Sequence, residues 1–262
     1  MICKPTALCE MRGQGVVANV PHYFELRPQG DLANTVECFW AMRQREKSVV
    51  LHRVVPDGCA DIIFTRNPNS TALVAVGAMT RFEEFELPPG QFTVGVRFHP
   101  GMWTGHLKVK GNEITDQALP LENLWGARAQ NLMDRLNNAN TPDECMNLLA
   151  CELPSISRPT AIQRAFICMR EWHGQVSLDD VANQCGLSTR QFRRACLEQT
   201  GLSPKFLARV LRFRNALAKV TSQAGEHAGL AAECGYFDQS HFIAEFRYFS
   251  GRTPGRYSLA AV

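Results

Sequence analysis

Residues 235–257 read GYFDQSHFIAEFRYFSGRTPGRY and carry seven aromatic side chains within a short polar stretch. A membrane-surface helix, a platform for stacking nucleic-acid bases and a very small folded core would each use this much ring surface. Phe242, Phe246 and Phe249 share one face of a helix that begins at Asp238, and the opposite face lacks the lysines and arginines of a membrane-surface helix. The spacing therefore predicts a helix whose rings form a core. Three further rings are expected to close its ends: Tyr236, Phe237 and Tyr257.

An earlier segment repeats this pattern. Residues 181–204 (VANQCGLSTRQFRRACLEQTGLSP) and 230–254 (LAAECGYFDQSHFIAEFRYFSGRTP) both read apolar-Ala-x-x-Cys-Gly, then an apolar residue, a helix cap and x-x-Phe. In both copies a Gly follows that Phe by nine residues and a Pro follows the Gly by three, while one extra residue lies in the second turn. Each copy is a short helix, a turn and a second helix. We therefore predict two helix-turn-helix units, at about 177–201 and 226–251.

The segment between the units, PKFLARVLRFRNALAKV at 204–220, predicts a linker helix with two stripes. Its apolar stripe is Phe206, Val210, Phe213, Leu217 and Val220. Its basic stripe is Lys205, Arg209 and Arg212. About seventeen helical residues span roughly 25 Å. Together with the width of the flanking units, this length brings the two second helices near the ~34 Å of one turn of DNA.

The exposed faces of these second helices are the candidates for contact with nucleic acid. In the first unit, Arg190, Arg193 and Arg194 lie away from Phe192, and a guanidinium matches guanine O6 and N7 or a phosphate. A solvated charged face is the alternative. The same face of the second unit carries small polar and apolar groups, suited to a base edge or a thymine methyl. They are Gln239, Ser240, Ile243 and Ala244, followed by Arg247.

The last hundred residues resemble the DNA-binding domain of the AraC/XylS-type bacterial transcription regulators. The resemblance rests on LRFRNALAKV and on G-Y-x-D-x-S-x-F-x-x-x-F-R-x-x-x-G-x-T-P-x-x-Y, from Gly235 to Tyr257. It implies that the second helix of each unit enters the major groove. By position, this assigns base reading to Arg190, Arg193, Arg194, Gln239, Ser240, His241 and Ala244. We assign phosphate contacts to Lys205, Arg209, Arg212 and Arg247.

The N-terminal part has a different residue pattern, which is typical of strands. Six short runs between residues 33 and 98 are rich in Val, Ile, Phe and Thr, and turn signals such as PDG and PPG separate them, which predicts an antiparallel barrel or sandwich. Two helices follow, and SISRPT at 155–160 is the best linker candidate. The predicted fold is α+β with two domains. Residues 1–155 form a β-rich, barrel-like domain with helices at its C-terminal end, and residues 156–262 form an all-α domain of two helix-turn-helix units.

Apolar stripes on the two helices near 121–153 allow two readings. They either pair two chains or cover one mouth of the barrel. The stripes are Leu132 and Leu136, then Met146, Leu149 and Leu153. The segments VVPDGCADIIF (54–64) and GVRFHPG (95–101) resemble the N-terminal domain of some AraC/XylS-type regulators. That resemblance implies a domain that senses a small molecule, dimerises, or does both.

Charge is unevenly placed along the chain. Residues 1–156 hold 14 Lys and Arg against 17 Asp and Glu, a net −3, while residues 157–262 hold 14 against 8, a net +6. A basic C-terminal part favours a polyanion partner. No run of eighteen apolar residues and no signal peptide is found, so we expect a cytoplasmic protein without a membrane partner.

The sequence thus predicts a sequence-specific regulator of transcription that binds double-stranded DNA under the control of a small-molecule effector. A homodimer is one option, and RNA polymerase is a partner if the protein activates. No cofactor, metal or catalytic residue is expected. A ligand-independent DNA-binding protein is the first alternative. The other is an enzyme or metal sensor that uses His52, Asp57, Cys59, Asp61, His99 and His106. The ten cysteines are scattered and are expected mainly to fill the core.

Overall fold

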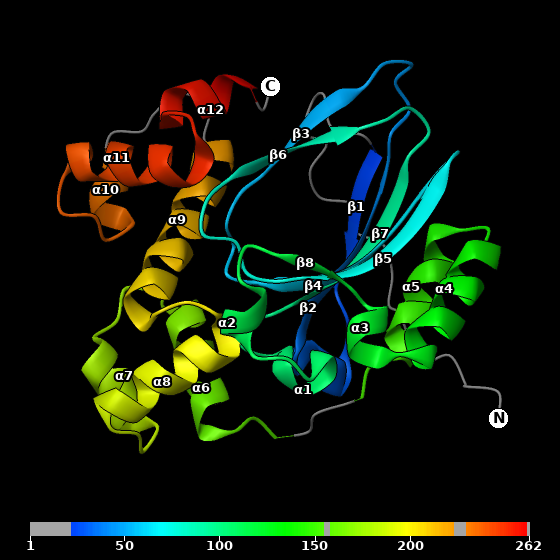
Figure 1. Cartoon of the computed structure of the whole chain (residues 1–262). Coiled ribbons are helices and arrows are strands. Elements are labelled where there is room, and N and C mark those ends of the chain that lie inside the picture. The colour runs from blue at the N-terminus through cyan, green and yellow to red at the C-terminus, as the bar shows by residue number, and fades with distance from the viewer. Residues whose placement is uncertain (1–21, 155–157, 223–228, 261–262) are drawn as a thin grey trace.

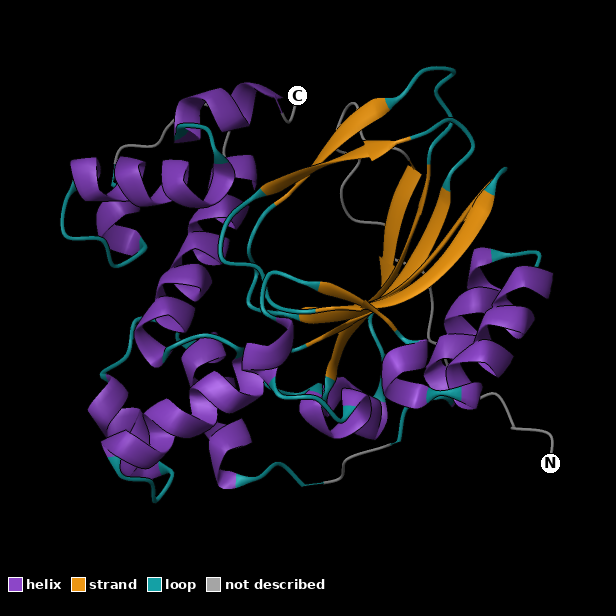
Figure 2. Ribbon diagram, viewed as in Figure 1, coloured by secondary structure: helices purple, strands orange, loops and turns teal. Residues whose placement is uncertain are grey.

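The computed structural model describes residues 22–154, 158–222 and 229–260, and it separates a sheet-rich N-terminal part from a helical C-terminal part (Figures 1 and 2). Six antiparallel strands form the main sheet in the order β1-β2-β7-β4-β5-β8. Their bounds are His22–Leu26 (β1), Val36–Arg43 (β2), Ala60–Asn67 (β4), Ser70–Val76 (β5), Phe92–Phe98 (β7) and Ala118–Pro120 (β8). Strands β3 (Val50–Val54) and β6 (Glu83–Leu87) pair as a separate ribbon.

The two faces of the main sheet pack against different elements. On one face, Phe92, Val94, Val96 and Phe98 alternate along β7 and are buried in the largest core cluster. Helices α4 (Ala127–Asn138) and α5 (Pro142–Cys151) cover this face. On the other face, a small cluster joins three side chains of β2 to Leu87 of the ribbon. The predicted β-rich fold is confirmed, as two sheets facing each other.

The apolar stripes of α4 and α5 are buried within the chain. Leu132, Leu136, Met146 and Leu149 are at most 1% exposed, and Leu153 is 9% exposed. The stripes therefore cover the sheet, and they offer no surface for pairing two chains. A homodimer remains a prediction that these residues do not support.

The C-terminal part consists of helices with clear start and stop residues. They are α6 (Ala161–Glu171), α7 (Leu178–Gln184), α8 (Thr189–Thr200), α9 (Pro204–Ser222), α10 (Leu230–Glu233), α11 (Gln239–Ser250) and α12 (Pro254–Ala260). Ser177, Ser188 and Asp238 cap α7, α8 and α11 through their side-chain oxygens. Gly201 and Gly251 end α8 and α11 in the left-handed conformation.

The two predicted units correspond to α7–α8 and α10–α11, and α9 joins them as the predicted linker helix (Figure 1). The start of the second predicted range, residue 226, lies outside the described residues, as do residues 155–157 of the predicted interdomain linker. The division into two domains near residue 155 remains a prediction.

The two units differ in how their cores are built. The core of the first unit, with Phe192 and Cys196, is continuous with the core of the main sheet. The second unit has its own cluster, in which Phe242, Phe246 and Phe249 are fully buried against α9. The rings meet edge to face or tilted, with Phe213 of α9 5.4 Å from Phe246 and 5.1 Å from Phe249. The aromatic residues of 235–257 therefore form mainly a core, as the spacing predicted.

Candidate nucleic-acid interface

The exposed face of α8 is a cluster of arginines. Ser188 and Gln191 form a reciprocal capping box at the start of α8, and Phe192 turns inward with 0% exposure. This fixes the rotation of the helix and leaves Arg190, Arg193 and Arg194 exposed. None of these three guanidiniums forms an ion pair with a described residue. The face is therefore open to an anionic partner.

The exposed face of α11 has the same geometry and a different chemistry. Because Phe192 and Phe242 are equivalent in the repeat, Arg190, Arg193 and Arg194 correspond in turn to three uncharged residues of α11. These are Ser240, Ile243 and Ala244, all exposed. They line an open hollow of about 690 Å³ together with Arg247 and Tyr248.

Two predicted base readers lie beside that face. Gln239 is exposed at the first position of α11. His241 is also exposed, and its Nδ1 accepts a hydrogen bond from the backbone N–H of Phe237 at 3.4 Å. Its ring meets Tyr236 edge to face, with the centroids 5.4 Å apart. These contacts fix the orientation of the His241 ring against the turn.

Phe237 corrects one expectation. Tyr236 and Tyr257 do contact the core rings, but the Phe237 side chain is 92% exposed, so the prediction that it closes the core is wrong. Phe237 is the extra residue in the second turn, since Leu187 is followed directly by the cap Ser188 in the first unit. The exposure of Phe237 could have been predicted from the sequence, because an inserted residue has no matching place in the core of the shorter copy.

The four predicted phosphate contacts divide into two pairs. Lys205 and Arg247 are exposed. Arg209 binds both carboxylate oxygens of Glu245 in α11 at 2.8 Å, and its guanidinium packs over three aromatic rings. Arg212 donates to the backbone oxygen of Gly235 at 3.3 Å. Arg209 and Arg212 thus join the linker helix to the second unit, which leaves Lys205 and Arg247 as the better candidates.

The N-terminal part contacts both units at the same point of the repeat, the end of the second helix. The backbone of Gly201 lies directly against Gly111 of α2 (Gly111–Ile114), where an added Cβ on Gly111 would be 2.3 Å from Gly201 N. The Thr115 hydroxyl is 3.2 Å from Gly201 O. In the second unit, Arg53 of the β3–β6 ribbon donates to Ser250 O at 2.8 Å.

The middle of α9 is also attached to the sheet, through a partly buried ion pair. Arg214 Nη2 donates to Glu37 Oε1 at 2.5 Å, and Glu37 lies at an irregularity in β2 that turns its side chain toward α9. Burial alone would raise the pKa of Glu37, but Arg214 and a hydrogen bond from the Cys59 thiol lower it to about 2. No sequence pattern indicated this contact, because its partners are 177 residues apart.

The residues of the enzyme alternative are distributed over this interior. Cys59 is fully buried, and burial raises the pKa of its thiol, so no thiolate nucleophile is available there. Asp57 and Asp61 form ion pairs with Arg97 at 3.2 and 3.4 Å. Burial lowers the pKa of His99 to about 4, and it also lowers the pKa values of His52 and His106. Within the described ranges, no three His, Cys, Asp or Glu residues are grouped as metal ligands.

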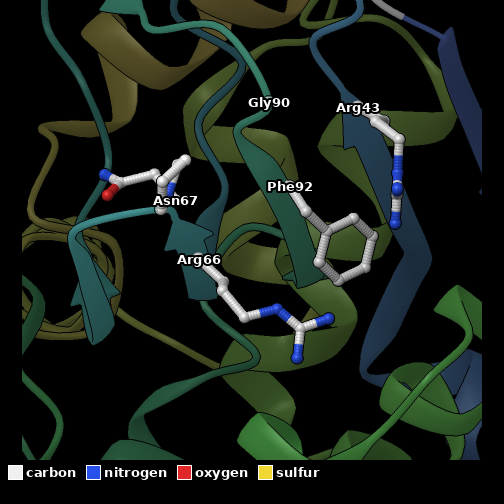
Figure 3. A pocket seen from close by; sticks show the side chains of 6 residues that line it. Arg43, Arg66, Asn67, Gly90 and Phe92 are labelled. Atoms are coloured by element: carbon white, nitrogen blue, oxygen red, sulfur yellow. The ribbon is translucent and has the colours of Figure 1, made fainter.

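A second hollow, of about 260 Å³, lies on the sheet and is unrelated to the two units (Figure 3). Arg43, Phe92 and Arg66 are register partners on β2, β7 and β4, and both guanidiniums lie 5.3 to 5.6 Å from the centre of the Phe92 ring. Arg66 also donates to the oxygens of Asn137 and Ala139 at the end of α4. The Arg66 guanidinium therefore serves to join the sheet to the end of α4.

In the part of the chain that the structure describes, no helix combines the length and apolarity needed to span a bilayer.

Comparison with known proteins connects these features to a family. Residues 181–259 match a family model described as a helix-turn-helix domain, and residues 24–120 match a domain of unknown function (DUF6597). The HTH-type transcriptional activator RhaS of Escherichia coli is 34% identical over 73 residues, which are 28% of this chain and 26% of RhaS. The chain thus spans about a quarter of the length of this relative.

Two solved structures show the range of similarity. ToxT from Vibrio cholerae aligns with 85% of this chain and 98% of its own, at 12% identity and a TM-score of 0.47. A transcriptional regulator from Chromobacterium violaceum with an AraC-type DNA-binding domain aligns with 39% of this chain and 92% of its own, at 22% identity and a TM-score of 0.37. Residues 181–259 are thus similar to the helix-turn-helix domain of RhaS, which supports the resemblance of this part of the chain to AraC/XylS-type regulators.

Proposed function

We propose that this protein is a sequence-specific DNA-binding regulator of transcription. The observation that carries the proposal is the duplication: two capped second helices with exposed faces precede and follow one 19-residue helix, α9, in the chain. A helix of that length spans about 28 Å, which suits two successive major grooves on one side of a duplex. Arg190, Arg193 and Arg194 supply charge for the first groove, and Gln239 and Ser240 supply hydrogen bonds for the second.

The contacts between the two parts favour regulated binding over constitutive binding. The N-terminal part contacts the end of α8 through Thr115 and the end of α11 through Arg53, and it binds α9 through Glu37. A shift of the ribbon relative to the main sheet would therefore change how the two second helices are presented. We propose that a small-molecule effector controls DNA binding through these three contacts.

Three further parts of the proposal follow from this role. A regulator of transcription works at the chromosome, so we place the protein in the bacterial cytoplasm. RNA polymerase is a partner if the protein activates. A homodimer would place two DNA-binding domains on neighbouring sites and raise the affinity through effective concentration.

The test is binding of the full-length chain to duplex DNA selected from a random library, compared with scrambled duplex. We expect selection of a defined site, and the triple variant Arg190→Ala, Arg193→Ala, Arg194→Ala is expected to lose it. A charge-matched control removes three exposed cations from the N-terminal part, Arg27, Arg45 and Lys47. Equal loss in both variants, or no preference for any duplex, contradicts the proposal. A genome-wide binding map with and without candidate metabolites then tests the effector.

A further inference from the structure

The second unit exposes apolar side chains that its own core does not need. Phe242, Phe246 and Phe249 are each 0% exposed and complete the core of the unit. Outside it, Phe237 is 92% exposed, Tyr248 is 49% exposed and Ile243 is 37% exposed. Phe237 lies in the turn before α11 and the other two lie on the helix, and a group of exposed apolar side chains of this kind is typical of a contact surface.

This group follows the axis of α11 from its N-terminal end. Phe237 directly precedes the cap Asp238. Ser240, Ile243 and Ala244 follow at helical spacing, and these three line the open hollow of about 690 Å³. The residues near the start of a recognition helix are those that contact base edges. Arg247 lies further along the helix and is the one exposed cation that lines this hollow.

The two units differ in charge at equivalent positions of their second helices. Where α8 has Arg190, Arg193 and Arg194, α11 has a hydroxyl, a branched alkyl group and a methyl group. Arginine is the side chain that best reads guanine, whereas the C5-methyl of thymine is the apolar group of the major groove and is read by apolar contact. The face of α11 is therefore a poor reader of guanine and a good surface for thymine methyls.

We propose that the second unit recognises its half-site through thymine methyl groups, which pack against Phe237, Ile243 and Ala244. This inference rests on the proposed function and specifies its second half-site. Ser240 lies between the apolar residues and hydrogen-bonds a base edge, and Arg247 holds the backbone. The first half-site is then read by charge and the second by methyl contact.

Deoxyuridine tests this directly, because replacing dT by dU removes one methyl and leaves pairing and backbone charge unchanged. The full-length chain is used to select a duplex from a random library, and each dT of the selected duplex is then replaced by dU in turn. We expect binding to weaken about fourfold for each methyl buried by the second unit. At the half-site of the first unit, the same replacement is expected to change little.

Variants identify the residues that contact the methyls. In Phe237→Ala and Ile243→Ala, the sensitive dT positions are expected to lose their sensitivity, because the methyl has lost its partner. Both side chains are exposed, so neither change disturbs the core. Trp172→Ala, at a side chain that is 64% exposed just beyond α6, is the matched control and is expected to keep the full dU effect.

The possible outcomes distinguish failure of the proposed function from failure of the thymine-methyl inference. If the chain selects no duplex, the proposed function fails and this inference fails with it. If it selects a duplex on which no dU replacement weakens binding, this inference fails and the proposed function stands. Sensitivity that persists unchanged in Phe237→Ala and Ile243→Ala also overturns it.

Discussion

The two helix-turn-helix units are copies of one pattern that differ both inside and outside. The first unit shares its core with the main sheet and exposes three arginines. The second has a separate core of aromatic rings and exposes an uncharged, partly apolar face. The backbone of the motif is thus set by the shared caps and glycines, while the core partners and the exposed residues are free to diverge.

The separate cores predict different patterns of local unfolding. Phe246→Ala removes a fully buried ring and is expected to destabilise the second unit by about 3–5 kcal/mol. In hydrogen exchange, the amides of α10 and α11 are expected to lose protection while the main sheet keeps its own. The matched change, Phe192→Ala, is expected to lower protection in both the first unit and the sheet, because their core is continuous. Equal loss in the sheet for both variants would show that the cores are not separate.

The ion pair that attaches α9 to the sheet predicts a dependence of stability on pH. The pKa of Glu37 is about 2 in the folded chain and about 4.3 in an unfolded one, so its contribution is present above pH 4.3 and is lost as the pH falls toward 2. The contribution is on the order of 3 kcal/mol. Urea unfolding between pH 6 and 2.5 measures it.

Glu37→Gln is the control for this titration. It removes the acid and leaves the partly buried Arg214 guanidinium without its ion-pair partner, so the variant is expected to be less stable at pH 6. Its unfolding free energy is also expected to fall less steeply below pH 4.3. An acid dependence identical to that of the unchanged chain would assign the titration to other carboxylates.

Exchanging the exposed residues of the two units tests how charge at equivalent positions affects DNA binding. Arg194→Ala is expected to weaken specific binding by about 1–3 kcal/mol and to relax preference at particular base pairs. The reciprocal change, Ala244→Arg, gives the second unit a cation at the equivalent position. It is expected to steepen the salt dependence by about one unit while reducing discrimination at the second half-site. Binding isotherms on selected and scrambled duplexes at several salt concentrations measure both effects.

The smallest effect distinguishes two neighbouring cations of α9. Lys205 is exposed, so Lys205→Ala is expected to weaken all duplexes alike and to lower the salt slope by about 0.9. Arg209 is held by Glu245, so Arg209→Ala is expected to leave the slope unchanged and to lower the stability of the second unit. A drop in slope for Arg209→Ala equal to that for Lys205→Ala would show that Arg209 leaves its partner to bind phosphate.

The helical part of the fold could be predicted because its determinants are local. Caps such as Ser188, C-terminal glycines such as Gly251 and the spacing of the phenylalanines lie within one unit of the sequence. Contacts between distant segments could not be predicted in this way. Glu37 and Arg214 are 177 positions apart and Arg53 and Ser250 are 197 apart, and such contacts produce no periodic pattern in the sequence. The ion pair of Arg209 could not be predicted for a related reason: its place on a basic stripe is visible in the sequence, whereas its partner Glu245 is on another helix.

Both units are expected to contact DNA, and they differ in how they read bases: the first through charged side chains and the second through uncharged ones. The most direct measurement is the salt dependence of binding to the selected duplex for three proteins. They are the unchanged chain, the triple arginine-to-alanine variant of α8, and Ser240→Ala combined with Ile243→Ala in α11. We predict a slope lowered by about one to three units in the α8 variant. In the α11 variant we predict an unchanged slope with a smaller ratio of specific to scrambled binding. Equal slopes and equal ratios in all three proteins would contradict the claim.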